Sequence, residues 1–178
     1  MSVDNPIDWS GEGTGYWNRV RQNPYVYIQD GEEVSCFTIN PKSERECQLD
    51  RAYMDVAKIF AGLSRAERLK VGAVLVKDRQ ILTEGYNGTP SGLDNTMEID
   101  GVTSEYAIHA EQNILMKMAK NTTSSVGSTL YVTHSPCATC AKLLYQAGIV
   151  RVVYEQEYRD TAPLEFLRDA GVQVEKLS

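Results

Sequence analysis

The sequence predicts a layered α/β fold with parallel strands in its C-terminal half. From residue 127 onward, segments typical of strands and of helices alternate in the order strand, helix, strand, helix, strand. Upstream, two runs typical of β-strands, 71–77 and 80–86, flank Asp78-Arg79 and predict a hairpin. The chain has 178 residues, of which 42% are hydrophobic, so it is long enough to bury one domain core.

The first 48 residues differ in character from the rest. They are rich in glycine, asparagine, aspartate and aromatic residues, and they show no helical period. Residues 25–29 and 32–37 lie on either side of Asp30-Gly31, a two-residue turn signal that predicts a β-hairpin. We therefore expect an N-terminal extension over residues 1–48 and the main domain over residues 49–178.

The main domain is expected to begin with a helix. Tyr53, Val56, Ala57 and Phe60 recur at helical spacing, and Gly62 marks the end of the pattern. The glycine-rich stretch 85–92 predicts a loop. The later elements are delimited by glycine stops at 148 and 171, by a candidate N-cap at 161 and by a proline at 163. They are helices over 109–120, 137–147 and 161–171, and strands over 129–133, 150–154 and 172–175.

The net charge limits the classes of binding partner that we expect. The net charge is −6 and the pI is about 5.0, whereas non-specific nucleic-acid binding needs clustered lysine and arginine. We therefore expect no nucleic-acid partner. No apolar run approaches the roughly 20 residues that span a bilayer, and the polar start lacks a signal-peptide core. We accordingly expect no membrane association and a cytoplasmic location.

Two cysteines have the spacing of metal ligands. Cys137 and Cys140 begin a predicted helix three residues apart, so that both sulfurs can face one point. The positive end of that helix lowers the pKa of a thiol and so favours the thiolate that binds metal. Alone, the pair could equally be a redox dithiol or half of a structural Cys₄ site. The other cysteines, Cys36 and Cys47, are eleven residues apart, which is not ligand spacing.

A second pattern resolves this ambiguity. His109 opens another predicted helix and is followed by Glu111, so the chain carries H-x-E and, later, P-C-x-x-C. Together these patterns are typical of zinc nucleobase deaminases. Three protein ligands, His109, Cys137 and Cys140, leave the fourth tetrahedral position open, as in catalytic zinc sites. Glu111, close to the metal without binding it, is the candidate general acid–base.

Four segments extend this pattern. They are His109-Ala110-Glu111-Gln112-Asn113, Tyr131-Val132-Thr133 with Ser135-Pro136-Cys137, Ala147-Gly148-Ile149, and the loop Gly85-Tyr86-Asn87-Gly88-Thr89-Pro90-Ser91-Gly92. Through these segments, residues 49–175 resemble the deoxycytidylate (dCMP) deaminases of the cytidine and deoxycytidylate deaminase superfamily, and the loop is specific to the dCMP branch. The resemblance implies a cytidine deaminase-like fold, with a five-stranded mixed sheet flanked by helices in α-β-α layers. It implies that dCMP and water give dUMP and ammonia, with dUMP supplying thymidylate synthesis.

The resemblance also implies substrate contacts. Asn87 should touch the sugar or phosphate, and Tyr158 should contact the nucleotide. The backbone N–H of Ala110 should hold the base carbonyl, and the backbone carbonyl of Ser135 should receive the exocyclic amine. Cys36, Cys47 and His134 do not supply a second ligand set, so one Zn²⁺ per chain is expected.

Regulation and assembly follow from the same resemblance as expectations. Members of the family often bind dCTP as activator and dTTP as inhibitor, at a separate site that includes the glycine-rich loop. Here that site would comprise Gly85, Tyr86, Asn87 and Gly88, with Mg²⁺ accompanying a bound dNTP. Members often assemble as hexamers, so a homo-oligomer is expected.

Three alternatives stay open at this point. The same chemistry could act on dCTP, cytidine, guanine or a riboflavin-pathway intermediate. A polynucleotide-editing deaminase would need a basic channel and stacking aromatics, which the acidic pI does not favour. A non-catalytic zinc module could bind a partner through the aromatic N-terminal arm, but such a module has no use for Glu111.

Overall fold

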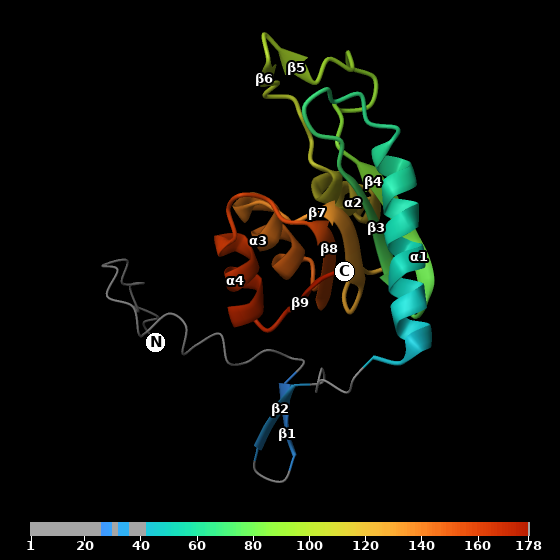
Figure 1. Ribbon diagram of the computed structural model, residues 1–178, viewed down its shortest axis with the longest axis vertical. Helices are drawn as coiled ribbons and strands as arrows, with labels where there is room; N and C mark the ends of the chain where they lie inside the picture. The colour runs from blue at the N-terminus through green and yellow to red at the C-terminus, as the bar shows by residue number, and fades with distance from the viewer. Residues whose placement is uncertain (1–25, 30–31, 36–41, 178) are drawn as a thin grey trace, which may run out of the picture. The chain divides into compact units, whose positions relative to one another are not determined.

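The computed structural model describes residues 26–29, 32–35 and 42–177, and the chain divides into two compact units, Met1–Cys36 and Phe37–Ser178 (Figure 1). The first unit contains β1 (Val26–Gln29) and β2 (Glu32–Ser35), which pair antiparallel at the position expected for the hairpin. Cys36 and the aromatic arm before residue 26 lie outside the described residues. Among the described helices, none combines the length and apolar character needed to cross a membrane.

The second unit is built on one five-stranded sheet in the order β4-β3-β7-β8-β9. β3 pairs antiparallel with both β4 and β7, whereas β7, β8 and β9 run parallel. The sheet is therefore mixed, with its parallel part in the C-terminal half, and the predicted fold class is confirmed. The strands are β3 (Gly72–Lys77), β4 (Gln80–Tyr86), β7 (Thr129–His134), β8 (Arg151–Gln156) and β9 (Gln173–Lys176).

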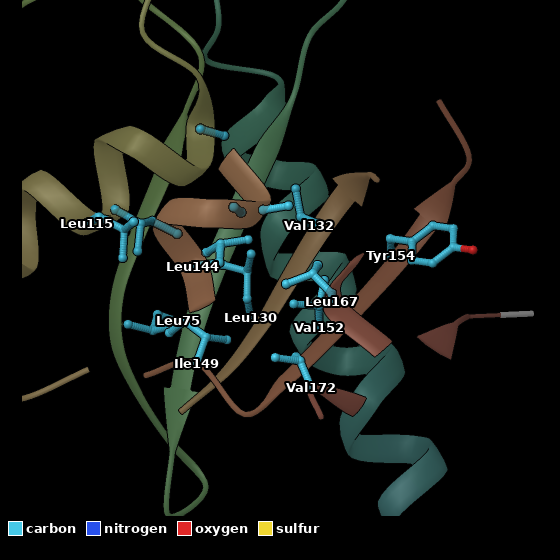
Figure 2. Close-up of a cluster of buried hydrophobic side chains, with 14 of the residues drawn as sticks. Leu75, Leu115, Leu130, Val132, Leu144, Ile149, Val152, Tyr154, Leu167 and Val172 are labelled. Carbon is cyan, nitrogen blue, oxygen red and sulfur yellow. The ribbon is translucent and has the colours of Figure 1, made fainter. Parts of the chain in front are cut away.

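Helices cover both faces of this sheet. Side chains alternate between the two faces of the sheet along β3. Val74 and Val76 pack on the face covered by α1, while Ala73 and Leu75 belong to the buried hydrophobic cluster on the opposite face. Figure 2 shows that opposite cluster, which α2, α3 and α4 close from their side. The helices are α1 (Glu44–Ala61), α2 (Ala110–Ala119), α3 (Ala138–Gln146) and α4 (Ala162–Asp169).

Helix α1 begins earlier than its apolar pattern indicates. Ser43 and Glu46 form a capping box, in which the Glu46 backbone N–H donates to the Ser43 hydroxyl and the Ser43 backbone N–H donates to the Glu46 carboxylate. The first turns are polar, so hydrophobic periodicity alone starts the helix too late. The helix consequently crosses the boundary expected near residue 48.

A small hairpin lies in the polar stretch for which the sequence predicted no element. β5 (Glu98–Ile99) and β6 (Val102–Thr103) pair antiparallel around Asp100-Gly101, whose φ angles of 52° and 75° are both positive. Two positive φ angles are what a type I′ turn requires, and Asp-Gly is a favoured pair for it. The turn signal was present, but two-residue strands have no periodicity to reveal them.

The sheet brings two helix starts together at one edge. β7 ends at His134 and leads directly through Ser135 and Pro136 into α3. The Ser135 N–H donates to the carbonyl of Gln156, at the end of neighbouring β8, with an N···O distance of 2.9 Å. The carboxyl ends of parallel strands are where open α/β sheets place their ligands. The N-terminus of α2 lies beside this edge, and the candidate site is found there.

Candidate active site

His109 and Cys137 hold equivalent positions at the starts of two helices. His109 is the N-cap of α2 and Cys137 is the N-cap of α3, and both have extended backbone angles. The side chain of Gln112 accepts the His109 backbone N–H at 2.9 Å, which holds the cap residue in place. Cys140 is one turn into α3 and is fully buried. Helix geometry therefore directs all three side chains to one point.

These side chains form a compact triangle. His109 Nδ1 lies 3.5 Å from Cys137 Sγ and 3.5 Å from Cys140 Sγ, and the three ligand atoms all lie within 4.8 Å of one another. A tetrahedral zinc with bonds of about 2.3 Å to sulfur and about 2.0 Å to nitrogen separates those atoms by about 3.5 Å. Among the described residues, no other group of three such side chains is this close. The donor set and its spacing therefore fit zinc.

The thiols already show a division of charge. Hydrogen bonds from Cys140 and His109 lower the pKa of Cys137 to about 3. The pKa of Cys140 is raised, because its thiol donates to Cys137 and is buried. The pKa of His109 is raised by the hydrogen bond to Cys137. The lowered pKa favours the thiolate of Cys137, the form of cysteine that binds metal.

Glu111 is a buried carboxyl group in the first turn of α2. Only 4% of the residue is exposed, and burial raises its pKa above the usual range. A carboxyl group held in this way can keep a proton and release it to a neighbouring base. Glu111 lines the same cavity as His109 and Cys137, so any proton that it moves is moved within that cavity.

The cavity has a volume of about 390 Å³ and gathers most of the expected site residues. Asn87, Ala110, Ser135 and Tyr158 line it, whereas Gly85, Tyr86 and Gly88 do not. Sequence reasoning missed several polar lining residues on loops, in the short β5–β6 hairpin and at the end of β7, where no spacing pattern points to a cavity. They are Arg68, Glu98, Thr103, His134 and Arg159.

Asn87 fastens the wall of this cavity. Its side-chain oxygen accepts the Val71 N–H at 2.8 Å, and its side-chain nitrogen donates to the Leu69 carbonyl at 2.8 Å. The Ser64 hydroxyl donates to the Asn87 carbonyl at 2.9 Å. The resemblance implies a contact of Asn87 with sugar or phosphate, which stays a prediction; what the structure shows is that Asn87 supports the 64–71 segment.

Ser135 and Tyr158 are joined to each other. The Tyr158 N–H donates to the Ser135 hydroxyl at 2.7 Å, so the side chain of Ser135 faces the loop after β8. The Arg159 guanidinium lies over the Tyr158 ring, with 5.6 Å between Cζ and the ring centroid. Tyr158 and Arg159 therefore enter the cavity wall as one unit.

Comparison with known proteins decides the family. The model for the cytidine and deoxycytidylate deaminase zinc-binding region matches residues 47–156, which include the whole His109, Cys137 and Cys140 group. The chain belongs to the cytidine and deoxycytidylate deaminase family. The family identified from the sequence is confirmed, and this deaminase contains the zinc-binding region of the family.

Relatives and solved structures agree with this assignment. The deaminase is 37% identical over 123 residues to the deoxycytidylate deaminase of Mycobacterium phage D29, covering 61% of this chain and 94% of that protein. It is 34% identical over 158 residues to the human deoxycytidylate deaminase, covering 81% and 85%. The crystal structure of the cyanophage S-TIM5 dCMP deaminase with dCMP and dUMP matches with a TM-score of 0.71 and 45% identity, covering 78% of this chain and 98% of that one.

Proposed function

We propose that this protein catalyses the hydrolytic deamination of dCMP to dUMP and ammonia. The observation that carries the proposal is that one cavity contains both groups for metal-assisted proton transfer and cations that can bind a phosphate. His109 and Cys137 of the metal-ligand group, the acid–base Glu111, and the cations Arg68 and Arg159 all line it. The cyanophage relative, whose crystal structure contains dCMP and dUMP, supports this substrate.

His109, Cys137 and Cys140 would hold the zinc ion. Three ligands leave one tetrahedral position for a water or substrate atom, as catalytic zinc sites do. The bound ion would supply Lewis-acid activation of the attacking water. The rest of the chemistry falls to side chains and backbone groups of the chain.

Glu111 moves the protons. It accepts a proton from the water that attacks C4 of the cytosine ring, and it delivers that proton to N3 of the ring. After the C4–O bond has formed, Glu111 passes a second proton from the new hydroxyl to the amino group, the C4–N bond breaks and ammonia leaves. The balance is dCMP plus water to dUMP plus ammonia. Burial supports this cycle, because it raises the pKa of Glu111 and lets the carboxyl group hold each proton between steps.

Backbone groups around the site would orient the base. The Ala110 N–H, at the start of α2, would donate to the pyrimidine carbonyl, and the Ser135 carbonyl would accept the exocyclic amine. Both residues line the cavity beside the metal-ligand group. An amide donor at a helix N-terminus has no partner within its helix, so it is free for the substrate.

The phosphate would be bound by cations at the cavity wall. Arg68 and Arg159 both line the cavity, as does Asn87, and the Arg159 guanidinium lies over the Tyr158 ring. Guanidinium groups present several donors in a planar fork that matches phosphate oxygens. Two cations at the wall favour an anionic nucleotide over free cytidine, because cytidine has no phosphate for them to bind.

Effector binding and assembly are carried forward as proposals. Gly85, Tyr86, Asn87 and Gly88 would contribute to a dCTP and dTTP site, with Mg²⁺ accompanying the triphosphate, and the chain would form a hexamer. The backbone N–H of Gly88 already donates to the Ile108 carbonyl, so Gly88 would act mainly by shaping the loop. Turnover with added dCTP or dTTP, and light scattering of the purified protein, test these two proposals.

One assay tests the proposed reaction. Ammonia release is compared for dCMP, dCTP, cytidine and single-stranded DNA, with the zinc-loaded full chain and with Glu111→Gln as the low-activity control. We expect dCMP to give the highest kcat/KM and the control to be about 10² to 10⁴-fold less active. Preferential turnover of cytidine or DNA would overturn the substrate assignment, and no turnover of any of the four would overturn the reaction.

A further inference from the structure

The β5–β6 hairpin contributes its two end residues to the substrate cavity. Glu98 and Thr103 are direct cross-strand partners, and both line the cavity. Directly opposed residues of an antiparallel pair project from the same face, so their side chains leave the hairpin together. The hairpin lies in the segment that links β4 to α2, outside the five-stranded sheet.

Both side chains reach the same arginine. The Glu98 carboxylate accepts the backbone N–H groups of Glu67 at 3.1 Å and of Arg68 at 3.4 Å. The Thr103 hydroxyl accepts a hydrogen bond from Arg68 Nη1 at 3.3 Å. The hairpin therefore holds Arg68 both at its backbone N–H and at its guanidinium. These two points lie on either side of a long side chain that has many rotamers.

Arg68 has particular need of this support. It is exposed and lies on a segment between α1 and β3 that has no helix or strand of its own. Holding a flexible side chain in place before binding reduces the entropy lost when its ligand arrives. The hydrogen bond from Nη1 to Thr103 restrains the orientation of the planar guanidinium at the cavity wall, and it uses only one of the five N–H donors of the group.

We propose that Glu98 and Thr103 are positioning residues that set the preference for a 5′-phosphorylated substrate by fixing Arg68 at the cavity. The proposal rests on the proposed function, because it assigns Arg68 to the substrate phosphate. It extends that function by making the β5–β6 hairpin part of substrate selection. Neither residue takes part in the deamination step, so their loss should affect recognition of the phosphate and leave the chemistry intact.

The test compares dCMP with deoxycytidine, which lacks the phosphate. We expect Glu98→Ala to raise KM for dCMP about tenfold, with kcat within about twofold and kcat/KM for deoxycytidine unchanged; tenfold corresponds to about 1.4 kcal/mol. Thr103→Val, which keeps the shape and removes the hydroxyl, should raise the same KM about threefold. Glu105→Ala is the matched control, because Glu105 is exposed in the same segment and does not line the cavity.

A double variant shows whether the effect passes through Arg68. In an Arg68→Ala background, Glu98→Ala should add less than a twofold change, since the residue that it positions is already gone. Full additivity would overturn the proposal, as would an equal loss of kcat/KM for dCMP and deoxycytidine. Thr103→Val keeps the test decisive if Glu98→Ala does not fold. If the proposed function itself is wrong, the wild-type protein will not convert dCMP at all. That result differs from every outcome that would overturn the role of Glu98 and Thr103.

Discussion

The carboxylate of Asp50 and the guanidinium of Arg151 form a two-pronged ion pair that joins α1 to β8. Arg151 Nη1 donates to Oδ1 at 2.9 Å and Nη2 donates to Oδ2 at 2.6 Å. The Tyr131 hydroxyl donates to Oδ1 at 2.6 Å, and Lys42 Nζ to Oδ2 at 2.7 Å. The Asp50 side chain is only 5% exposed, so this network satisfies a charge that would otherwise be costly to bury.

Removal of the Asp50 charge should destabilise the fold. Asp50→Asn leaves Arg151 in a largely buried position with Glu175 as its remaining carboxylate partner. We expect a loss of about 3 kcal/mol in the free energy of unfolding, as for other broken buried pairs. Urea unfolding measures it. Asp55→Asn is the control on the same helix, since the Asp55 side chain is 70% exposed and should change stability by less than about 0.5 kcal/mol. Equal effects of the two changes would contradict the prediction.

The same pair makes stability depend on acid pH. Burial would raise the pKa of Asp50, but hydrogen bonds from Arg151, Lys42 and Tyr131 outweigh it and lower the pKa to about 2. A lowered folded-state pKa means that the stabilisation is complete above the unfolded value of about 3.9 and is lost as the pH falls towards 2. We expect about 2 kcal/mol of stability to disappear across this window. Asp50→Asn should flatten the pH dependence between pH 4 and pH 2, measured by urea unfolding.

Helices and strands that carry a long apolar pattern could be predicted from the sequence, whereas elements that depend on short polar signals could not. The helix of Ile114 and the parallel strands of Val132 and Val152 show apolar patterns that burial requires, and the structure has them where the patterns are. The hairpin at Glu98 and the early start of α1 at Glu44 depend on short polar signals, and hydrophobic periodicity does not register such signals.

The candidate site divides in the same way. His109, Cys137 and Cys140 lie at the starts of two helices, in the H-x-E and P-C-x-x-C patterns. These patterns together indicate that the three side chains converge on one metal ion. Arg68 and Arg159 lie on loops, and their presence at one cavity depends on how the 64–71 segment and the loop after β8 fold back. No local pattern encodes that tertiary placement.

Gly85 is required by the close approach of β4 and α2. A Cβ atom at this position would lie 2.9 Å from Ile114 Cγ1 and 3.0 Å from the Ala110 carbonyl oxygen. We expect Gly85→Ala to cost about 1–3 kcal/mol, as overpacking does. The double variant with Ile114→Ala should be more stable than the sum of the two single losses predicts, by at least about 0.5 kcal/mol. Thermal and urea unfolding check this, with Gly88→Ala as control because nothing lies within 4 Å of a Cβ there. Simple additivity would show that the two residues do not compete for the space.

Cys137 should couple metal content to stability. We expect Cys137→Ala to lose the zinc, since two ligands remain, and to unfold at lower urea concentration because a metal that binds only the folded state stabilises it. Elemental analysis of the purified protein should fall from about one zinc per chain to none. Cys47→Ala is the control, because Cys47 is a free cysteine of α1 outside the triangle. A Cys137→Ala protein that still holds one zinc per chain would remove this residue from the ligand set.

Glu111 should separate turnover from metal binding. Glu111→Gln keeps the size of the side chain and removes its ability to take up and release a proton, so kcat should fall by about 10² to 10⁴-fold. The zinc content should stay near that of the wild type, because the ligand triangle consists of His109, Cys137 and Cys140 without the carboxylate. Steady-state kinetics with dCMP and elemental analysis on the same preparation give both quantities, with the exposed Glu105→Gln as the control. Near-normal turnover would assign the proton transfer to another group, and a loss of zinc together with turnover would make Glu111 part of the metal site.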